Sequence, residues 1–465
     1  MIREIFKHII DFLVEALRKE EIWLLLILVV VGGTSLISAS DLLSVILRYF
    51  LMFWWFWFFI ILFPIFGSVY RYYRQEVFKR TIEFALLEIK MPREITKSPQ
   101  AMEQVLAAIH SLRNSADSFK DKYIDGIVTC WFSLEIVNFA GENEIHFFIR
   151  TPAQHKNIIE TALFSYYPDI EVELVDDYIS KLPANVKELE ERDLDVWGAE
   201  MVLAKEEALP IKTYPYFESA AEEKQIDPIS NFLEVLGKTK KDETVGIQIL
   251  IAPAGSSWKD KWGKFVIDLQ KPTTIKSKSE SGTSEMSLGR SPGKNEVLEA
   301  VERNLSKPAF DTLIRLLYLA PRPTFFESFV KGGLISAFNQ YSALNFNSFK
   351  SNSAAGTQSS PVKNPTDQSM ISGWASKNRF LYNFIHREIP PETWAGFWLG
   401  GNFSLNTSYA SRRFVMNIGG LATLFHPPTA IVLTAPHIKR VESRKTGPPA
   451  GLAIFGEEED LERFQ

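Results

Sequence analysis

The strongest hydrophobic pattern of the chain lies near its N-terminus. Residues 22–39 contain no charged side chain, and residues 42–66 contain one, Arg48. An α-helix of 18 residues is about 27 Å long, enough to cross the hydrocarbon core of a bilayer. Only Ser40 and Asp41 separate the two runs, so we predict a transmembrane helical hairpin over residues 22–68. A cleaved signal peptide is the competing interpretation, but a second apolar run follows the first at once.

Basic residues flank this hairpin at both outer ends, at positions 3, 7, 18 and 19 before it and 71, 74, 79 and 80 after it. The positive-inside rule then predicts a two-pass protein of the inner (cytoplasmic) membrane, with both termini and the soluble part in the cytoplasm. The apolar residues of the segment 1–21 fall on one helical stripe, which predicts an amphipathic helix at the membrane surface. The alternative is a helix that packs on the soluble part. Because aromatic side chains normally gather at membrane interfaces, we expect the aromatic run 53–59 to pack against another helix.

Beyond the hairpin the pattern changes from continuous apolar runs to alternation. Residues 76–87 read as a helix that continues out of the membrane. Residues 127–137 and 144–149 read as paired strands, 153–166 as a helix and 170–175 as a further strand. This order predicts a first α+β module of the split βαβ, or ferredoxin-like, kind over residues 69–182.

A similar order follows in the next part of the chain, and it predicts a second ferredoxin-like α+β module over residues 183–350. The expected strands are 199–203, 245–251 and 310–319, and the expected helices are 227–236, 258–269, 296–305 and 325–341. The two modules resemble an internal duplication, although their sequence identity is too weak to establish one.

Polar and proline-rich stretches complete the division of the chain. Residues 271–292, inside the second module, and residues 351–369 are rich in Ser, Thr and Lys or of low complexity. Such compositions bury too little apolar area to offset the entropy of ordering, so we predict mobile loops. The last part, 370–465, is expected to complete the fold and to end in a proline-rich exit and an acidic tail.

Composition narrows the function classes. The 465-residue chain has a net charge of −5, with 23% charged and 46% apolar residues, which gives no sign of bulk nucleic-acid affinity. We therefore expect nucleic acid to be contacted only indirectly. The single cysteine, Cys130, excludes an intramolecular disulfide and a cysteine zinc cluster, and its apolar surroundings predict a buried structural thiol.

No constellation with catalytic or ligand-binding spacing is found. The string nearest to a phosphate-binding loop is Gly237-Lys238-Thr239, but Phe232 stands where that loop needs a glycine. We interpret Gly237 as a helix C-cap, and the lysines at 238, 240 and 241 as a solvated turn. The seven histidines, at positions 8, 110, 146, 155, 386, 426 and 437, show no metal-ligand spacing. We accordingly predict no catalytic, cofactor-binding or metal-ligating residue, no cofactor and no enzyme activity.

Several segments nevertheless resemble a known group of proteins. These segments are residues 85–94, 131–136, 146–152, 166–168, 245–253 with Trp258, and 443–449. They are similar to the membrane-anchored N-terminal or accessory region of bacterial conjugation and type IV secretion related DNA-transfer ATPases. The similarity spans about residues 84–455, and the motor domain of those ATPases has no counterpart before Gln465.

The resemblance implies a non-catalytic accessory or docking subunit of a type IV secretion or conjugation-like DNA or protein transfer apparatus. Such a subunit would be anchored in the membrane, contact membrane lipid and recruit a separate P-loop ATPase through protein–protein interaction. Self-association into a homo-oligomer remains open. The competing hypothesis is a membrane-bound enzyme, such as a hydrolase with dispersed carboxylates, whose site one sequence does not reveal.

Overall fold

The computed structural model describes residues 48, 51–92, 97–116, 118–139, 144–218, 226–240, 242–271, 273–279, 282–288, 291–325, 327–352, 354–357, 369–390, 411–429 and 440–441. The chain divides into two compact units. The first comprises Met1–Thr81, Ala116–Val128 and Pro391–Gly400, and the second comprises Ile82–Ser115, Thr129–Pro390 and Gly401–Gln465.

The described part of the first unit consists of helix α4 (Trp54–Arg80) and a short π-helix, Lys120–Asp125, that packs against it. The Nε atom of Arg74 donates a hydrogen bond of 2.7 Å to the carbonyl oxygen of Ile124. Gly126 follows with a φ of 68°, and a Cβ atom there would lie 2.4 Å from the backbone of Arg74. Only glycine fits this position, because the left-handed conformation and the close approach both disfavour a side chain.

The predicted transmembrane hairpin is wrong. Among the residues that the structure describes, no helix is long and apolar enough to cross a membrane. The aromatic run forms the beginning of α4. The same helix continues through the polar and basic sequence of residues 70–80, so the apolar run is only one part of a longer helix. The first predicted span, 22–39, and the predicted surface helix, 1–21, lie outside the described residues. The two-pass topology and the inner-membrane localisation that we derived from the hairpin are corrected with it.

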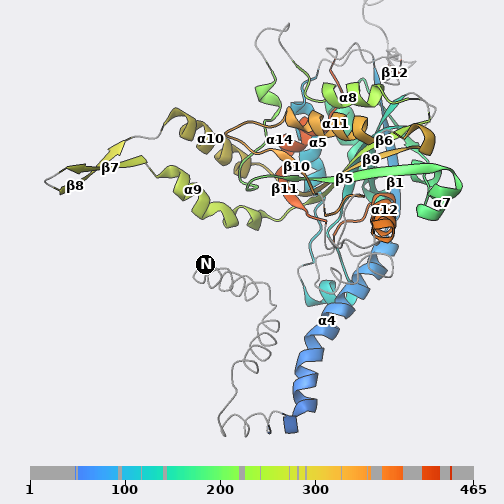
Figure 1. Ribbon diagram of the computed structural model, residues 1–465, viewed down its shortest axis with the longest axis horizontal. Coiled ribbons are helices and arrows are strands. Elements are labelled where there is room, and N and C mark those ends of the chain that lie inside the picture. Colours follow the sequence, from blue (N-terminus) through green and yellow to red (C-terminus); the bar gives the residue numbers. More distant parts are fainter. Residues whose placement is uncertain are drawn as a thin grey trace, which may run out of the picture. The chain divides into compact units, whose positions relative to one another are not determined.

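The second unit is built on a ten-stranded sheet in which nine strands are antiparallel (Figure 1). The strands are β1 (Phe84–Pro92), β2 (Phe132–Asn138), β3 (Ile145–Pro152), β4 (Glu171–Val175), β5 (Leu194–Leu203), β6 (Thr244–Pro253), β9 (Ala309–Pro321), β10 (Phe349–Asn352), β11 (Phe414–Asn417) and β12 (Arg440–Val441). The main order is β10-β5-β9-β6-β2-β3-β1-β12, with β4 also on β1 and β11 also on β9. The two-residue strand β12 is the parallel exception.

The fold is α+β, but the prediction of two ferredoxin-like modules is wrong, because a single large sheet forms. Strands β2 and β6 pair along seven residues, from Phe132 opposite Ile251 to Asn138 opposite Val245. This pairing joins the strands β4-β1-β3-β2 to the strands β6-β9-β5-β10 without a break. The sequence shows the hydrophobic alternation of each strand but not which strand lies beside it, so the central join was not visible.

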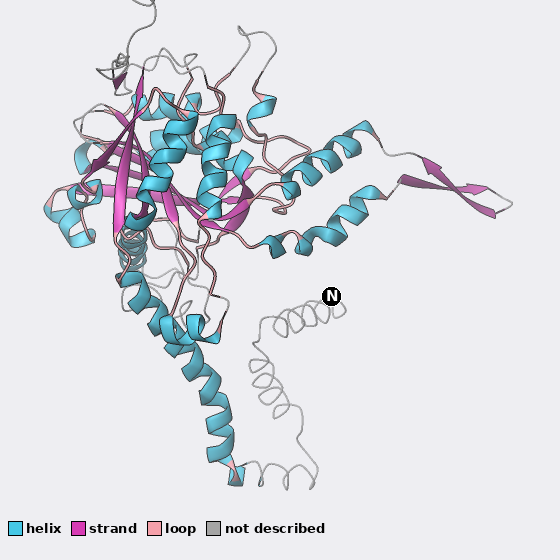
Figure 2. Ribbon diagram, turned by 180° about the vertical axis from the view of Figure 1, so that it is seen from behind, coloured by secondary structure: helices cyan, strands magenta, loops and turns pink. Residues whose placement is uncertain are grey.

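Helices cover both faces of this sheet (Figure 2). One face carries the larger core, which includes side chains of α5 (Gln100–Ser111), α6 (Lys156–Tyr166), α8 (Ser230–Gly237), α11 (Glu327–Asn339) and α14 (Ile418–Leu424). A smaller apolar cluster on the opposite face includes side chains of α7 (Val186–Glu191) and α12 (Ser369–Ile385). Period-2 alternation along the strands separates the two sets: Leu134 and Ile136 belong to the larger core, and Val137 to the smaller one.

Two local predictions are also corrected, and others fall on residues that the structure does not describe. The helix expected over residues 76–87 ends at Arg80, and β1 begins at Phe84. The predicted loop at 271–292 contains an antiparallel hairpin, β7 (Thr273–Ser279) with β8 (Gly282–Leu288), between α9 (Gly263–Gln270) and α10 (Pro292–Ser306). Most of residues 351–369 and of the proline-rich exit, and all of the acidic tail, lie outside the described residues.

Candidate functional site

A row of polar side chains crosses the sheet on the face covered by α7 and α12. Backbone pairing aligns one residue from each of seven neighbouring strands, all polar except Phe148: Glu88, Phe148, Glu135, Gln248, Arg315, Glu200 and Asn352. Five of these side chains are buried: Glu88, Glu135, Gln248, Arg315 and Glu200. Burying a charged group costs free energy unless that group is paired. The hydrogen-bond and ion-pair partners of these side chains therefore determine the role of the row.

The centre of the row is an ion pair between Glu135 and Arg387. Arg387 donates from Nε to Glu135 Oε1 at 2.6 Å and from Nη2 to Oε2 at 3.0 Å. It also binds both carboxylate oxygens of Asp177, at 2.6 and 3.0 Å. Arg387 lies just beyond α12 and has a φ of 50°, which is unfavourable for a side chain of this size. The four hydrogen bonds hold it in that conformation.

Glu135 receives three further hydrogen bonds. Ser133 Oγ donates to Oε1 at 2.5 Å, Tyr178 Oη donates to Oε2 at 2.7 Å, and Gln248 Nε2 donates to Oε1 at 3.3 Å. Burial alone would raise the pKa of Glu135, but the charge of Arg387 and these hydrogen bonds hold its pKa below the usual range. Burial, together with the charge of Glu135, raises the pKa of Tyr178 well above its ordinary value.

A second buried pair continues the row toward the other end of the sheet. Arg315 Nε donates to Glu200 Oε1 at 3.1 Å, and its two Nη atoms donate to the carbonyl oxygens of Asn383 and Glu388 at 2.9 and 2.7 Å. Ser411 Oγ donates to Glu200 Oε1 at 2.7 Å. The row therefore ties α12, the residues after it and the segment before β11 to the strands, and its ionised groups are engaged in structure.

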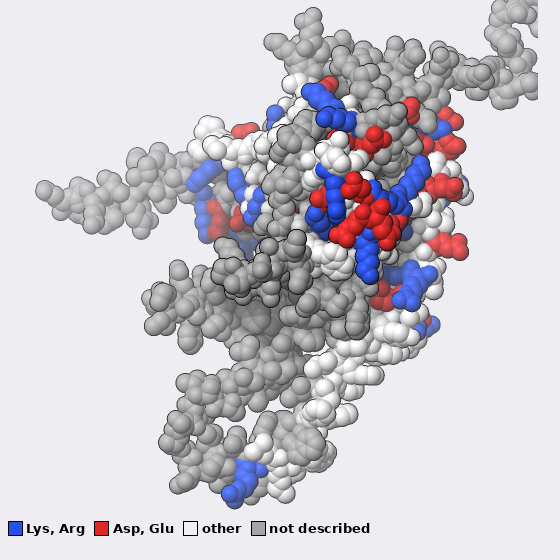
Figure 3. Space-filling view, turned by 45° about the vertical axis from the view of Figure 1, so that its right-hand side comes forward, with Lys and Arg blue, Asp and Glu red and all other residues white. Residues whose placement is uncertain are grey.

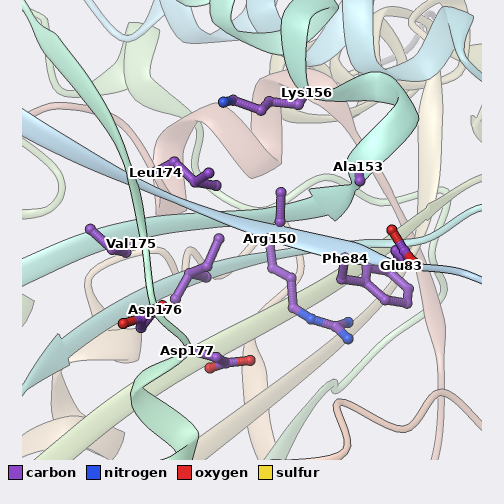
Figure 4. A pocket seen from close by; sticks show the side chains of 11 residues that line it. Glu83, Phe84, Arg150, Ala153, Lys156, Leu174, Val175, Asp176 and Asp177 are labelled. Carbon is purple, nitrogen blue, oxygen red and sulfur yellow. The ribbon is translucent and has the colours of Figure 1, made fainter.

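A cavity of about 470 Å³ lies near the β1 and β4 end of the same face (Figure 4). Its lining residues are Glu83, Phe84, Ala85, Leu86, Arg150, Ala153, Lys156, Leu174, Val175, Asp176 and Asp177. The guanidinium carbon of Arg150 lies 3.5 Å from the centre of the Phe84 ring. Burial, with the charge of Arg387 nearby, lowers the pKa of Arg150 to about 10, so the guanidinium stays charged at neutral pH.

In the first unit, by itself, α4 carries many large apolar side chains that are exposed. The exposed residues include Trp55, Phe56, Phe58, Phe59, Leu62, Phe63, Phe66, Val69, Tyr70 and Tyr73. Phe59, Phe63 and Phe66 are each about two-thirds exposed, at 64%, 64% and 65%. Residues 54–70 of α4 include no charged side chain, and the charged residues of the helix lie between Arg71 and Arg80. The space-filling view shows an uncharged surface in one part of the molecule and interspersed basic and acidic groups in another (Figure 3). Exposed apolar surfaces of this extent mark interaction sites.

The structure places the sequence candidates apart from these features. Gly237 is the last residue of α8, and Lys238, its C-cap residue, pairs with Glu234 at 3.8 Å. Helix α8 leads directly into this turn, where a phosphate-binding loop would follow a strand. Asp177 is a partner of Arg387.

The described histidines are spread over the fold. His146 Nδ1 lies 2.6 Å from Glu88 Oε1, and His426 Nε2 lies 2.9 Å from Asp227 Oδ1. His110 packs edge-on against Phe310. Within the described ranges, no group of three or more His, Cys, Asp or Glu side chains is arranged to hold a metal ion.

Sequence reasoning missed Glu135, Arg315, Arg387 and Arg150. Glu135 and Arg315 stand as single charges inside apolar strands, at positions that alternation assigns to one face. That signal could have predicted a buried polar row. Arg387 gave no comparable signal, because its partners are distant in sequence. Arg150 stands as a charge at the end of an apolar strand, but the ring that it stacks on, Phe84, is distant in sequence.

Comparison with protein families adds one result. No curated protein matches the chain. A family model described as "Domain of unknown function (DUF8128)" matches residues 71–378. The matched segment runs from the second half of α4 to the middle of α12 and contains every residue that lines the cavity. Because this segment is about two-thirds of the 465 residues, the chain belongs to the DUF8128 family.

Proposed function

We propose that this protein is a non-catalytic docking subunit, which binds a partner protein through the exposed aromatic surface of α4. The observation that carries the proposal is that surface itself: ten large apolar side chains between Trp55 and Tyr73 are exposed on one helix. Phe, Tyr and Trp are enriched in the buried centres of protein–protein interfaces, where they fill pockets of the partner. A helix that presents them in successive turns suits a groove on a partner.

The sheet unit supports the non-catalytic part of the proposal. Its central carboxylate, Glu135, accepts hydrogen bonds on both oxygens and is fully buried, so it is not placed to take a proton from a substrate. The competing hypothesis, a hydrolase, needs a nucleophile or an acid–base pair in a cavity. The residues that line the 470 Å³ cavity include no Ser, Thr, Cys, Tyr or His. The lining does include the carboxylates Glu83, Asp176 and Asp177 and the amine of Lys156, but Asp177 is bound by Arg387 and Lys156 is paired with Glu160.

The partner class in the proposal is a P-loop ATPase of a DNA or protein transfer apparatus. The segments that resemble the accessory region of such ATPases are its support, and several of them, including β2, β3 and β6, form the centre of the sheet. A separate docking subunit raises the local concentration of its motor, as fusion of the two would.

The test is direct binding between the purified full-length chain and a purified P-loop ATPase encoded in the same genome. The triple variant Phe59→Ser, Phe63→Ser, Phe66→Ser is expected to weaken binding at least about 100-fold, because each truncated interface anchor typically costs about 1 kcal/mol or more. Leu344→Ser is the matched control, since Leu344 is 94% exposed on the sheet unit and should leave binding unchanged.

Four outcomes would overturn the proposal. The ATPase could fail to bind the wild-type chain, or it could bind the triple variant equally well. Alternatively, light scattering could show that the α4 surface is buried between two copies of the chain, or flotation could show that it binds lipid vesicles in place of the ATPase.

A further inference from the structure

We propose that the cavity beside Arg150 is a binding site for a monocarboxylate, whose two oxygens are held by the guanidinium of Arg150. The site lies wholly in the sheet unit, formed by β1, β3, β4, the start of the α6 segment and the residues after β4. It is independent of the docking surface on α4.

Arg150 is prepared for such a ligand in two ways. Its flat face is covered by Phe84, at 3.5 Å from guanidinium carbon to ring centre, which fixes the plane of the guanidinium and leaves its N–H edge for an acceptor. It makes no side-chain hydrogen bond or ion pair with the described residues, unlike Arg387 and Arg315 on the same face. A mostly buried guanidinium without an acceptor is unusual, and a planar carboxylate matches its fork of donors.

The other charges around the cavity limit the ligand to one negative charge. Asp177 is bound by Arg387, and Lys156 is paired with Glu160 at 3.6 Å. Glu83 and Asp176 also line the cavity, and their negative charges would repel a second charge on the ligand. A phosphate dianion is therefore disfavoured relative to a carboxylate.

The remaining lining defines the body of the ligand. Phe84, Leu86, Leu174 and Val175 give the cavity an apolar wall. A volume of about 470 Å³ lies within the range of small-molecule sites, which are mostly apolar with a few polar groups that orient the ligand. The site suits a carboxylate that carries a small apolar or aromatic group, either in a free acid or at the C-terminus of a peptide.

Three probes that share a phenyl group test the charge requirement: benzoate, the isosteric neutral benzamide and the dianionic phenyl phosphate. Calorimetric titration of the full chain is expected to give saturable benzoate binding, with benzamide and phenyl phosphate at least about 10-fold weaker. Arg150→Lys keeps the charge but loses the fork, and it should weaken benzoate about 10-fold or more. Arg150→Gln should abolish binding. Lys238→Gln is the matched control, because it removes an exposed positive charge outside the cavity, and it should change binding less than about 2-fold.

Phe84→Leu provides a second variant should Arg150→Gln fail to fold, and it is expected to weaken benzoate by releasing the guanidinium plane. A short apolar peptide with a free C-terminus, compared with its amide, separates the two sources of carboxylate. Absence of benzoate binding, equal binding by Arg150→Gln, or tighter binding of phenyl phosphate than of benzoate would each overturn the proposal. None of these results bears on ATPase docking, since the docking variants lie in the other unit.

Discussion

Replacement of Arg387 by methionine is expected to lower the free energy of unfolding of the sheet unit by about 3–5 kcal/mol, the usual cost of removing one partner of a buried ion pair. Methionine is long and apolar, so it keeps much of the volume without the charge. Most of this lost stability comes from Glu135, which is 0% exposed and would keep its negative charge without a cation beside it. Asp177, with 43% of its side chain exposed, can be solvated instead.

A second substitution separates charge from packing. In the double variant Arg387→Met, Glu135→Gln the buried charge is gone, and Ser133, Tyr178 and Gln248 still have an amide to bond with. We expect this double variant to recover about half or more of the loss, since replacing both members of a buried pair often costs little. The strained φ of 50° at position 387 is the same in all these variants, so it cancels in the comparison.

The pH dependence gives an independent signature. In the wild type the pKa of Glu135 is depressed, so its contribution to stability is present above its unfolded pKa of about 4.3 and is lost as pH falls through the lower folded value. Without Arg387, burial would raise the pKa of Glu135 above its unfolded value. The variant should then become more stable, relative to the wild type, as pH falls from 7 to 5.

Urea unfolding followed by circular dichroism, at pH 7 and pH 5, measures both effects. The reasoning is refuted if Arg387→Met unfolds at the wild-type urea concentration. It is equally refuted if the double variant is no more stable than the single one, or if the deficit of the single variant does not shrink at pH 5.

Three further predictions follow from buried contacts. Asp227→Asn should cost about 1–3 kcal/mol in thermal unfolding, because Asp227 accepts hydrogen bonds from His426 and Thr429. Burial alone would raise the pKa of Asp227, but the charge of His426 lowers it, so this contribution should vanish as pH falls through the folded value, and only in the wild type. Gly198→Ala should cost about 1–3 kcal/mol, because a Cβ atom would lie 2.1 Å from the Phe380 ring, and adding Phe380→Leu should restore stability. Because burial raises the pKa of Cys130 to about 12, iodoacetamide at pH 8 should label Cys130 far more slowly in the folded chain than in urea, as mass spectrometry would show.

The strands were predictable where a run of alternating or continuous apolar residues was long. The expected strands at 144–149, 245–251 and 310–319 correspond to β3, β6 and β9, all of which are buried inside the sheet. β1 was missed because residues 76–87 are compatible with a continuing helix, and neither glycine nor proline marks the end of α4 at Arg80. Tertiary contacts determine that this segment is a strand, because β1 pairs with another strand on each of its edges, β3 and β4.

The candidate sites were less predictable than the strands. Arg387 meets Glu135 across 252 positions of sequence, and no local pattern encodes that contact. Arg150 was visible as a charge at the end of an apolar strand, but its stacking on Phe84 depends on the register between β3 and β1. The transmembrane prediction was wrong for a related reason. It rested on the hydropathy of the aromatic run without the polar sequence that completes α4.

The position of the polar row explains why this sheet tolerates so much buried charge. Glu135 and Gln248 face each other across β2 and β6, the two strands that join the halves of the sheet. Both strands are apolar at most other positions, so apolar patterning alone specifies their relative register weakly. A slip of one residue would move Glu135 into the larger core without Arg387, at the cost of an unpaired buried charge. We therefore expect the ion pair to disfavour the slipped register at the central join, through the residues after α12 that supply Arg387.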